Sequence, residues 1–218
     1  FESSIKIVSC MPVEFIKSNI KIDGDLTDWE SKPIVYLKDR SVLQELLAGA
    51  GDPTLIWFDE NDFSAELYLG WDKNNLYIGA KVKDDIFSQK FKGELIWQGD
   101  SIQIAIIPKM DTEIEQTQIG LSLVEDKPYF HRFRGDLKDT TKTEYIVKRN
   151  DGNKNTIYEM AIPLNELNIS AKSTNTLMFS FLVNDNDGGG RKTIIEWGKG
   201  IHSRGDFVSF KPLVFKEK

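Results

Sequence analysis

Aspartates stand beside several predicted turns, where their carboxylate oxygens can meet on a cation. Asp84 and Asp85 end one alternating apolar run, and Asp185 and Asp187 lie in the acidic loop NDNDGGG that follows another. Calcium takes about six to eight oxygen ligands, and paired carboxylates on neighbouring loops are a usual source of them. The four aspartates are therefore candidate metal ligands if the loops meet. The alternative interpretation is a solvated acidic loop.

The stretch Asn19–Trp29 also carries several aspartates, in the segment IDGDLTDW. Its spacing resembles an oxygen-ligand calcium loop in part, but the glycine and the distal glutamate of such a loop are misplaced. The simpler interpretation is an Asx-turn with Trp29 packed beneath it.

Nucleophilic catalysis has little support in this sequence. Cys10 is the only cysteine, and His131 and His202 are the only histidines. No cysteine or serine constellation surrounds either histidine, so a nucleophilic triad is not predicted. A pair of glycosidase carboxylates can be hidden among the 34 acidic residues, but nothing in the sequence locates it.

The composition excludes some classes of partner. The chain has 218 residues with a formal net charge of -6, and no basic stripe is available to neutralise phosphates. We therefore expect no binding to nucleic acid or to membranes, and no apolar run is long enough to span a bilayer. One cysteine rules out an intrachain disulfide. The sequence begins at Phe1 without a signal peptide, from which we expect a mature or excised fragment.

The segment Ser64–Ile107 gives the clearest structural signal. Apolar and polar residues alternate through 64–71 and again through 76–83, on either side of a short Asp/Asn turn. This pattern predicts an antiparallel hairpin with one buried face. A third run follows, in which Ile102, Ile104 and Ile106 point inward and the residues between them point outward.

The rest of the chain repeats this pattern in about ten short runs separated by turn residues. The exception is Ser41–Ala48, which predicts the one short helix, with Ser41 as its cap. We therefore predict an all-β fold, an antiparallel β-sandwich of immunoglobulin-like or jelly-roll-like topology with one short helix. Residues 1–19 are predicted to be an N-terminal extension or edge strand, and residues 20–218 a single sandwich domain.

Five segments, taken in order, carry a family resemblance. They are Ile22–Trp29, Leu69–Asp84, Ile96–Ile106, Tyr158–Leu167, and Phe179–Asp187 followed by Arg191 and Ile195–Gly198. In this order and spacing the chain resembles the family 9 carbohydrate-binding modules and the wider DOMON-like sandwiches. The resemblance covers roughly residues 20–215.

The resemblance implies a non-catalytic module that binds polysaccharide or oligosaccharide. Such modules are usually appended to secreted enzymes that degrade polysaccharides, and they often hold structural calcium. It therefore implies an extracellular or cell-surface location, a carbohydrate ligand, and a catalytic domain on the same polypeptide as a partner.

The resemblance also indicates sugar-binding residues. In the family two tryptophans enclose a terminal sugar, and Trp97 matches the first of them. Gln103 stands where the family has an acidic residue, Gly120 lies near the position of its arginine, and the second tryptophan is replaced by the stretch around His202. A core or rim position is the alternative for Trp197, and a plug at the sandwich edge is the alternative for Trp97. The candidate sugar contacts are Trp97, Gln98, Gln103, Gln118, Arg191, Trp197 and His202.

Three other functions remain open at this stage. DOMON-like sandwiches include haem binders, which need axial ligands such as methionine with histidine or lysine. Met160 and Met178 are candidates by type, but both follow the alternation of core positions. A catalytic domain acting on sugars and a structural spacer without a ligand are the other two.

Overall fold

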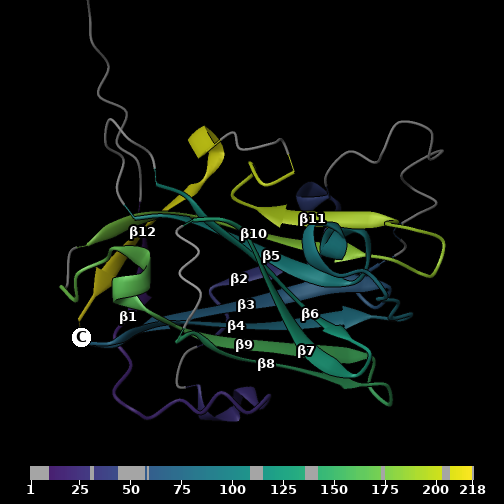
Figure 1. Ribbon diagram of the computed structural model, residues 1–218, viewed down its shortest axis with the longest axis horizontal. Helices are drawn as coiled ribbons and strands as arrows, with labels where there is room; N and C mark the ends of the chain where they lie inside the picture. The colour runs from purple at the N-terminus through teal and green to yellow at the C-terminus, as the bar shows by residue number, and fades with distance from the viewer. Residues whose placement is uncertain are drawn as a thin grey trace, which may run out of the picture.

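The fold is taken from a computed structural model of the chain. It describes residues 10–29, 32–43, 57, 59–108, 115–135, 142–172, 175–202 and 207–217. Its strands form two sheets that pack face to face, which confirms the predicted β-sandwich (Figure 1).

The first sheet has five strands in the order β2-β3-β4-β9-β8. Their bounds are β2 Val35–Leu37, β3 Phe63–Trp71, β4 Asn75–Asp84, β8 Glu144–Asn150 and β9 Asn155–Pro163. All neighbours are antiparallel. The hairpin β3–β4 turns at Asp72, whose carboxylate accepts hydrogen bonds from the backbone N–H groups of Asn74 and Asn75. The predicted central hairpin is thus confirmed.

The second sheet has seven strands in the order β1-β12-β10-β5-β6-β7, with β11 also paired to β10. Their bounds are β1 Met11–Glu14, β5 Ser101–Ile107, β6 Thr117–Val124, β7 Lys127–Arg134, β10 Thr176–Asp185, β11 Thr193–Trp197 and β12 Lys211–Lys216. Strand β1 lies at the edge and runs parallel to β12, so the predicted N-terminal edge strand is present. The predicted boundary between residues 19 and 20 stays a prediction.

Helical structure among the described residues is limited to short 3-10 helices of three to six residues. They are η1 Leu26–Asp28, η2 Arg40–Val42, η4 Gly93–Gln98, η5 Leu164–Leu167 and η6 Phe207–Ser209. Of the helix predicted over 41–48, Ser41 and Val42 lie in η2, but Leu43 forms an isolated β-bridge with Ile195 instead of continuing a helix. Residues 44–48 lie outside the described part.

The core between the sheets follows the alternation in the sequence. On β3 and β5 the inward residues include Leu67, Trp71 and Ile104, each at most 1% exposed. Trp71 stacks on Phe215 with the ring centroids 4.7 Å apart and meets Phe15 edge to face, so it is a core residue, as predicted.

The outer faces of both sheets are covered as well, which the alternation did not predict. Ala105 and Ile107 of β5 pack with Phe210, and Gln103 is 5% exposed. The prediction that the residues between the inward isoleucines of β5 point outward is confirmed. These residues point away from the core, but segments from elsewhere in the chain cover them.

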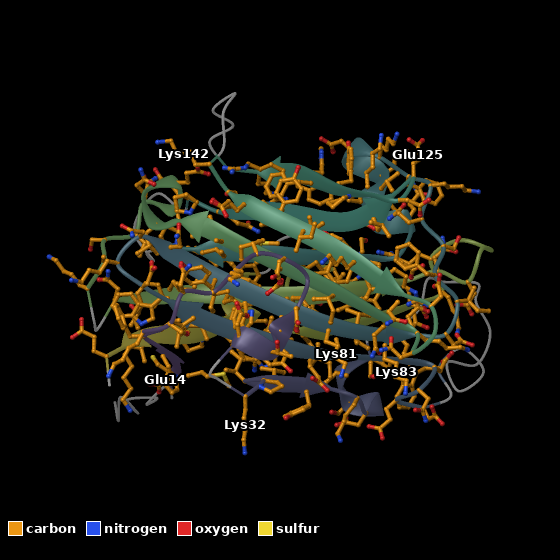
Figure 2. All side chains as sticks on the ribbon, turned by 90° about the horizontal axis from the view of Figure 1, so that it is seen from below. Glu14, Lys32, Lys81, Lys83, Glu125 and Lys142 are labelled. Carbon is orange, nitrogen blue, oxygen red and sulfur yellow. The ribbon has the colours of Figure 1, made fainter. Side chains whose placement is uncertain are left out.

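The N-terminal segment covers the outer face of the five-stranded sheet, which faces the reader in Figure 2. Trp29 is buried there and donates a hydrogen bond from its indole N–H to Glu159 at 2.8 Å. Asp23 and Asp25 form Asx-turns by accepting from the backbone N–H two residues on. The Asx-turn interpretation of this stretch is confirmed. A Cβ at Gly79 would lie 3.0 Å from the Trp29 ring, so the glycine lets the segment approach closely.

Candidate functional site

The outer face of the seven-stranded sheet gathers most of the predicted sugar contacts. Since Ile102 and Ile104 point into the core, Gln103 between them points outward. Gln103 lies opposite Leu182 of β10 and opposite Gly120 of β6. Glu196 of β11 in turn lies opposite Leu182, so these strands present one continuous row across the outer face.

The short 3-10 helix η4 lies on this face and carries Trp97. Its Ile96 is fully buried, and a Cβ on Gly120 would stand 3.2 Å from Ile96 and 3.0 Å from Phe133. Glycine at position 120 therefore allows η4 to lie directly on the strand. The backbone N–H of Gly93 donates to the Tyr129 hydroxyl at 2.9 Å and ties the start of η4 to β7.

Trp97 is half-buried and meets Arg191 rather than another ring. The Arg191 guanidinium lies over the indole, 4.4 Å from the ring centroid, which is a close cation–π contact. Arg191 also approaches the Asn184 side-chain oxygen at 3.4 Å. The ring of Trp97 therefore belongs to a polar surface and is not part of the sandwich core.

Two amides stand side by side on the same face. The Gln118 side-chain N–H₂ donates to the Gln103 side-chain oxygen at 3.1 Å. After this one bond, Gln118 keeps one N–H and its carbonyl oxygen, and Gln103 keeps both of its N–H donors. The pair can therefore hydrogen-bond the hydroxyls of a ligand without leaving a buried group unsatisfied.

Glu196 holds the loop that follows β11 against this face. Its Oε1 accepts from the backbone N–H groups of Gly200 at 3.0 Å and Ile201 at 2.7 Å, and from that of His202 at 3.4 Å. Burial raises the pKa of the Glu196 carboxyl above its ordinary value, against the effect of these hydrogen bonds. His202 is placed near Arg191, and burial together with the Arg191 charge lowers the pKa of its imidazole.

The structure does not bring every predicted contact to this face. Trp197 is in phase with Ile195 and packs with Phe179 on the core side, at a centroid distance of 6.1 Å. Trp197 therefore occupies a core or rim position, which was the alternative to its being a sugar contact. The backbone carbonyl of Gln98 accepts from the Asn186 side chain at 2.7 Å, which fixes the end of η4. Met160 is fully buried in the core, as the alternation predicted. The same prediction for Met178 is wrong, because Met178 is half-buried on the outer face, where it packs with Ala105, Ile107 and Phe210.

The predicted metal ligands meet at one end of the sandwich, on the core-facing side. Carboxylate oxygens of Asp84, Asp85 and Asp187 lie within 4.8 Å of one another. A second group shares Asp84 and adds Asp100 and Asp185 within the same distance. The loops that carry the aspartates therefore converge, although the solvated-loop interpretation would have left them apart.

Several oxygens of this acidic cluster lack hydrogen-bond partners among the described residues. They are Asp84 Oδ2, Asp85 Oδ1, Asp185 Oδ2 and Asp187 Oδ1, all buried. Buried carboxylate oxygens without donors cost free energy unless a proton or a cation satisfies them. The donor set, which consists of oxygen atoms alone, suits calcium.

Burial and mutual repulsion raise the pKa values in the acidic cluster. Burial, reinforced by the charges of Asp84 and Asp185, raises the pKa of Asp100 to about 9. Burial raises the pKa of Asp185 to about 8 and that of Asp84 to about 6. A group of carboxylates that resists ionisation in this way is a site where added positive charge binds favourably.

Lys192 supplies part of that positive charge. Its ammonium lies 2.8 Å from Asp187, 3.0 Å from Asp62 and 3.9 Å from Asp185. Arg149 adds a weaker contact to Asp84 at 3.7 Å. The cluster therefore holds more carboxylates than these two cations balance.

Some residues of both sites were not predicted. Asp100 follows Gly99 at the start of β5, and only its burial and its neighbours mark it as part of the cluster. Asn184 and Glu196 alternate with core residues on β10 and β11, so strand alternation alone assigns them to the outer face. The stretch Asp23–Asp28 lies on the outer face of the five-stranded sheet and is not in the metal-ligand groups of the described residues.

Comparison with known proteins gives a consistent family signal. A family model described as "Carbohydrate family 9 binding domain-like" matches residues 52–202. A search of curated proteins gives no match. Among the described residues, no helix is long and apolar enough to cross a membrane.

Two similar solved structures come from Caldicellulosiruptor kristjanssonii. One is a family 9 carbohydrate-binding module in complex with cellotriose, at 18% identity and a TM-score of 0.71, covering 96% of this chain and 95% of that one. The other is described as such a module in complex with glucose, at 17% identity and a TM-score of 0.70, covering 95% and 96%. At these identities the likeness shows a shared fold over nearly the full length of both chains.

Proposed function

The chain belongs to the carbohydrate family 9 binding domain-like family, a family of non-catalytic binding modules, and we propose that it binds carbohydrate on the outer face of its seven-stranded sheet. The observation that carries the proposal is that Trp97, carried by η4 over Gly120, and the amide pair Gln103–Gln118 lie on the same outer face. The complexes of similar structures with cellotriose and glucose support the class of ligand.

The chemistry of the face suits a sugar. A pyranose has a CH-rich face that packs against an aromatic ring, and Trp97 supplies a half-buried ring. Its hydroxyl groups both donate and accept, and the amides of Gln103 and Gln118 can do the same. The side chain of His202 borders the same region.

The biological role that we propose is attachment. A binding module on the same polypeptide as a glycoside-degrading domain keeps that domain near its polysaccharide, which raises its effective concentration. We propose that the chain serves a secreted protein in this way, at the cell surface or outside the cell.

We further propose that the acidic cluster holds structural calcium. Asp84, Asp85, Asp185 and Asp187, with Asp100 beside them, offer the buried oxygens that such an ion needs. Bound calcium would supply the positive charge that lets these carboxylates ionise together. The residues present fit the ion, and Lys192 occupies only one side of the cluster.

Isothermal titration calorimetry tests the carbohydrate proposal. The titrants are xylo-, gluco- and manno-oligosaccharides of two to six residues, with the protein in calcium-containing buffer. We expect saturable heat with at least one series and no turnover of chromogenic glycosides. Absence of heat with every oligosaccharide would reject the proposal, and the folded protein would then be a structural spacer.

A further inference from the structure

Arg191 and Lys192 are neighbours in the chain, but their side chains go to opposite faces of the seven-stranded sheet. Lys192 enters the acidic cluster on the core-facing side, where Asp62 and Asp187 bind it. Arg191 goes to the outer face and covers Trp97. Lys192 therefore contributes its charge to the acidic cluster, whereas the charge of Arg191 lies on the other side of the sheet.

The charge of Arg191 has no carboxylate partner among the described residues. Its guanidinium contacts the neutral Asn184 side chain, and its Nε is buried without a hydrogen bond to the described part of the chain. The pKa of Arg191 is lowered, and the cause is burial of the guanidinium. A half-buried cation in this state is costly, and an added anion relieves that cost.

Among the described residues, Asn184 is the polar side chain that accepts a hydrogen bond from Arg191, and the other polar groups of this face pair elsewhere or stay unpaired. Gln103 and Gln118 are amides that pair with each other. Glu196 is a carboxylate of this face, and its Oε1 accepts from three backbone N–H groups of the loop at 200–202. Its Oε2 is buried without a hydrogen-bond partner among the described residues, and no ion pair joins it to Arg191 there. The face therefore has a local positive charge at Arg191, although the chain as a whole carries a net charge of -6.

A guanidinium recognises a carboxylate through two parallel hydrogen bonds. Beside an aromatic ring and a pair of amides, the ligand that offers a carboxylate together with a pyranose ring is a uronic acid. A neutral sugar gives Arg191 no charge partner and must compete with the guanidinium for the surface of Trp97. Resting on the proposed function, we propose that the site prefers acidic sugars, with the uronate carboxylate on Arg191 and the ring hydroxyls toward Gln103 and Gln118.

Calorimetry with matched sugar pairs tests this preference. Each pair differs only at C6: methyl glucuronide against methyl glucoside, and the corresponding galacto and manno pairs. We expect at least one acid to bind at least about tenfold tighter than its neutral partner, because one charge-assisted hydrogen bond contributes that much. The preference should shrink as salt is added, since it rests on charge.

Variants assign the preference to one side chain. R191M keeps much of the packing on Trp97 and loses the charge, so the acid and its neutral partner should bind alike. R191K keeps a charge without the two-bond geometry and should retain part of the preference. K32M is the matched control, because it removes one positive charge from an exposed position far along the chain and should leave the preference intact (Figure 2).

The outcomes separate this inference from the proposed function. If neutral sugars bind as tightly as their acids, or if R191M keeps the preference, the inference is overturned and carbohydrate binding stands. If neither acidic nor neutral sugars give heat, both are overturned. Loss of the preference in R191M but not in K32M supports the inference.

Discussion

Trp97 and Trp71 are the same residue type in two environments, and they should respond differently to removal. Trp71 is 1% exposed between two aromatic neighbours, whereas Trp97 is half-buried beside a cation. Because it is buried, Trp71 contributes to the stability of the fold. The contact with Arg191 leaves Trp97 on a surface that a ligand can share.

We expect Trp97→Ala to abolish carbohydrate binding with little loss of stability. Stacking on an aromatic ring contributes about 1–3 kcal/mol to binding of bases, and we take that scale for a sugar. Trp71→Ala is the matched control and should destabilise the fold by about 3–5 kcal/mol. Urea unfolding and calorimetry measure the two effects. A stability loss in Trp97→Ala as large as that in Trp71→Ala would make Trp97 a core residue.

The buried carboxyl of Glu196 predicts that the stability of the fold depends on pH. Its folded pKa is raised above the ordinary value of 4.5, so the folded state keeps its proton where the unfolded state releases it. Stability from this group therefore falls as the pH rises above that ordinary value. Glu196→Gln cannot ionise, so its stability relative to the wild type should increase from about pH 4 to about pH 7. A difference in unfolding free energy that is the same at every pH would contradict this account.

At the scale of elements, η4 is the piece that places Trp97: hydrogen bonds hold its two ends, and one buried side chain supplies its apolar anchor. Ile96 is fully buried over Gly120, whereas its neighbour Leu95 is about half exposed at 49%. The anchoring is thus a matter of apolar contact between η4 and the outer face of β6.

Ile96→Ala should cost about 2–5 kcal/mol of stability and weaken sugar binding, because the cavity loosens η4 and the ring it carries. Leu95→Ala, one residue away, should stay within about 0.5 kcal/mol of the wild type and bind normally. Chemical denaturation and calorimetry on both variants check the pair. Equal effects of the two substitutions would show that η4 is not anchored through Ile96.

The sequence predicted the strands well because alternation reports the core-facing side directly. The runs that became β3, β4, β5, β9 and β10 all show it. It could not predict what covers the other faces, since the covering segments come from far along the chain. Gln103 is buried by such coverage, and Asp100 joins the acidic cluster through strands that only the fold brings together.

The sequence predicted several residues of the candidate site, but not how these residues are arranged. The resemblance pointed to Trp97 and Gln103, and the fold places both on one face. It also suggested Trp197, whose position in phase with Ile195 sends it to the core side instead. The stacking of Arg191 on Trp97 had no signal in the sequence, because the two residues are joined only when η4 folds onto the sheet.

For the molecule as a whole, the acidic cluster is built from residues of both sheets. Asp84 ends β4 in the five-stranded sheet, whereas Asp185 ends β10 in the seven-stranded sheet and Asp100 directly precedes β5 of that sheet. A cation bound between them would hold the sheets together at this end of the sandwich.

Calcium should therefore raise the melting temperature. Calcium at a hundredfold excess over its dissociation constant adds about 2.7 kcal/mol, or roughly 5–10 °C for a chain of this length. Thermal melts in calcium and in chelator measure the difference, magnesium serves as the control ion, and Asp185→Asn should reduce the effect. Superimposable curves in calcium and chelator would exclude a structural calcium.

Because Arg191 and Lys192 are adjacent in the chain and point in opposite directions, binding of a cation in the acidic cluster can be coupled to binding of sugar at Trp97. A cation entering the acidic cluster repels the Lys192 ammonium, and the adjacent peptide carries any shift to the guanidinium on Trp97. Linkage is reciprocal, so whatever factor calcium applies to sugar affinity, sugar must apply to calcium affinity. Titrating each ligand with and without the other yields two factors that must agree. In a medium where calcium varies, such a module would attach and release according to the ion around it.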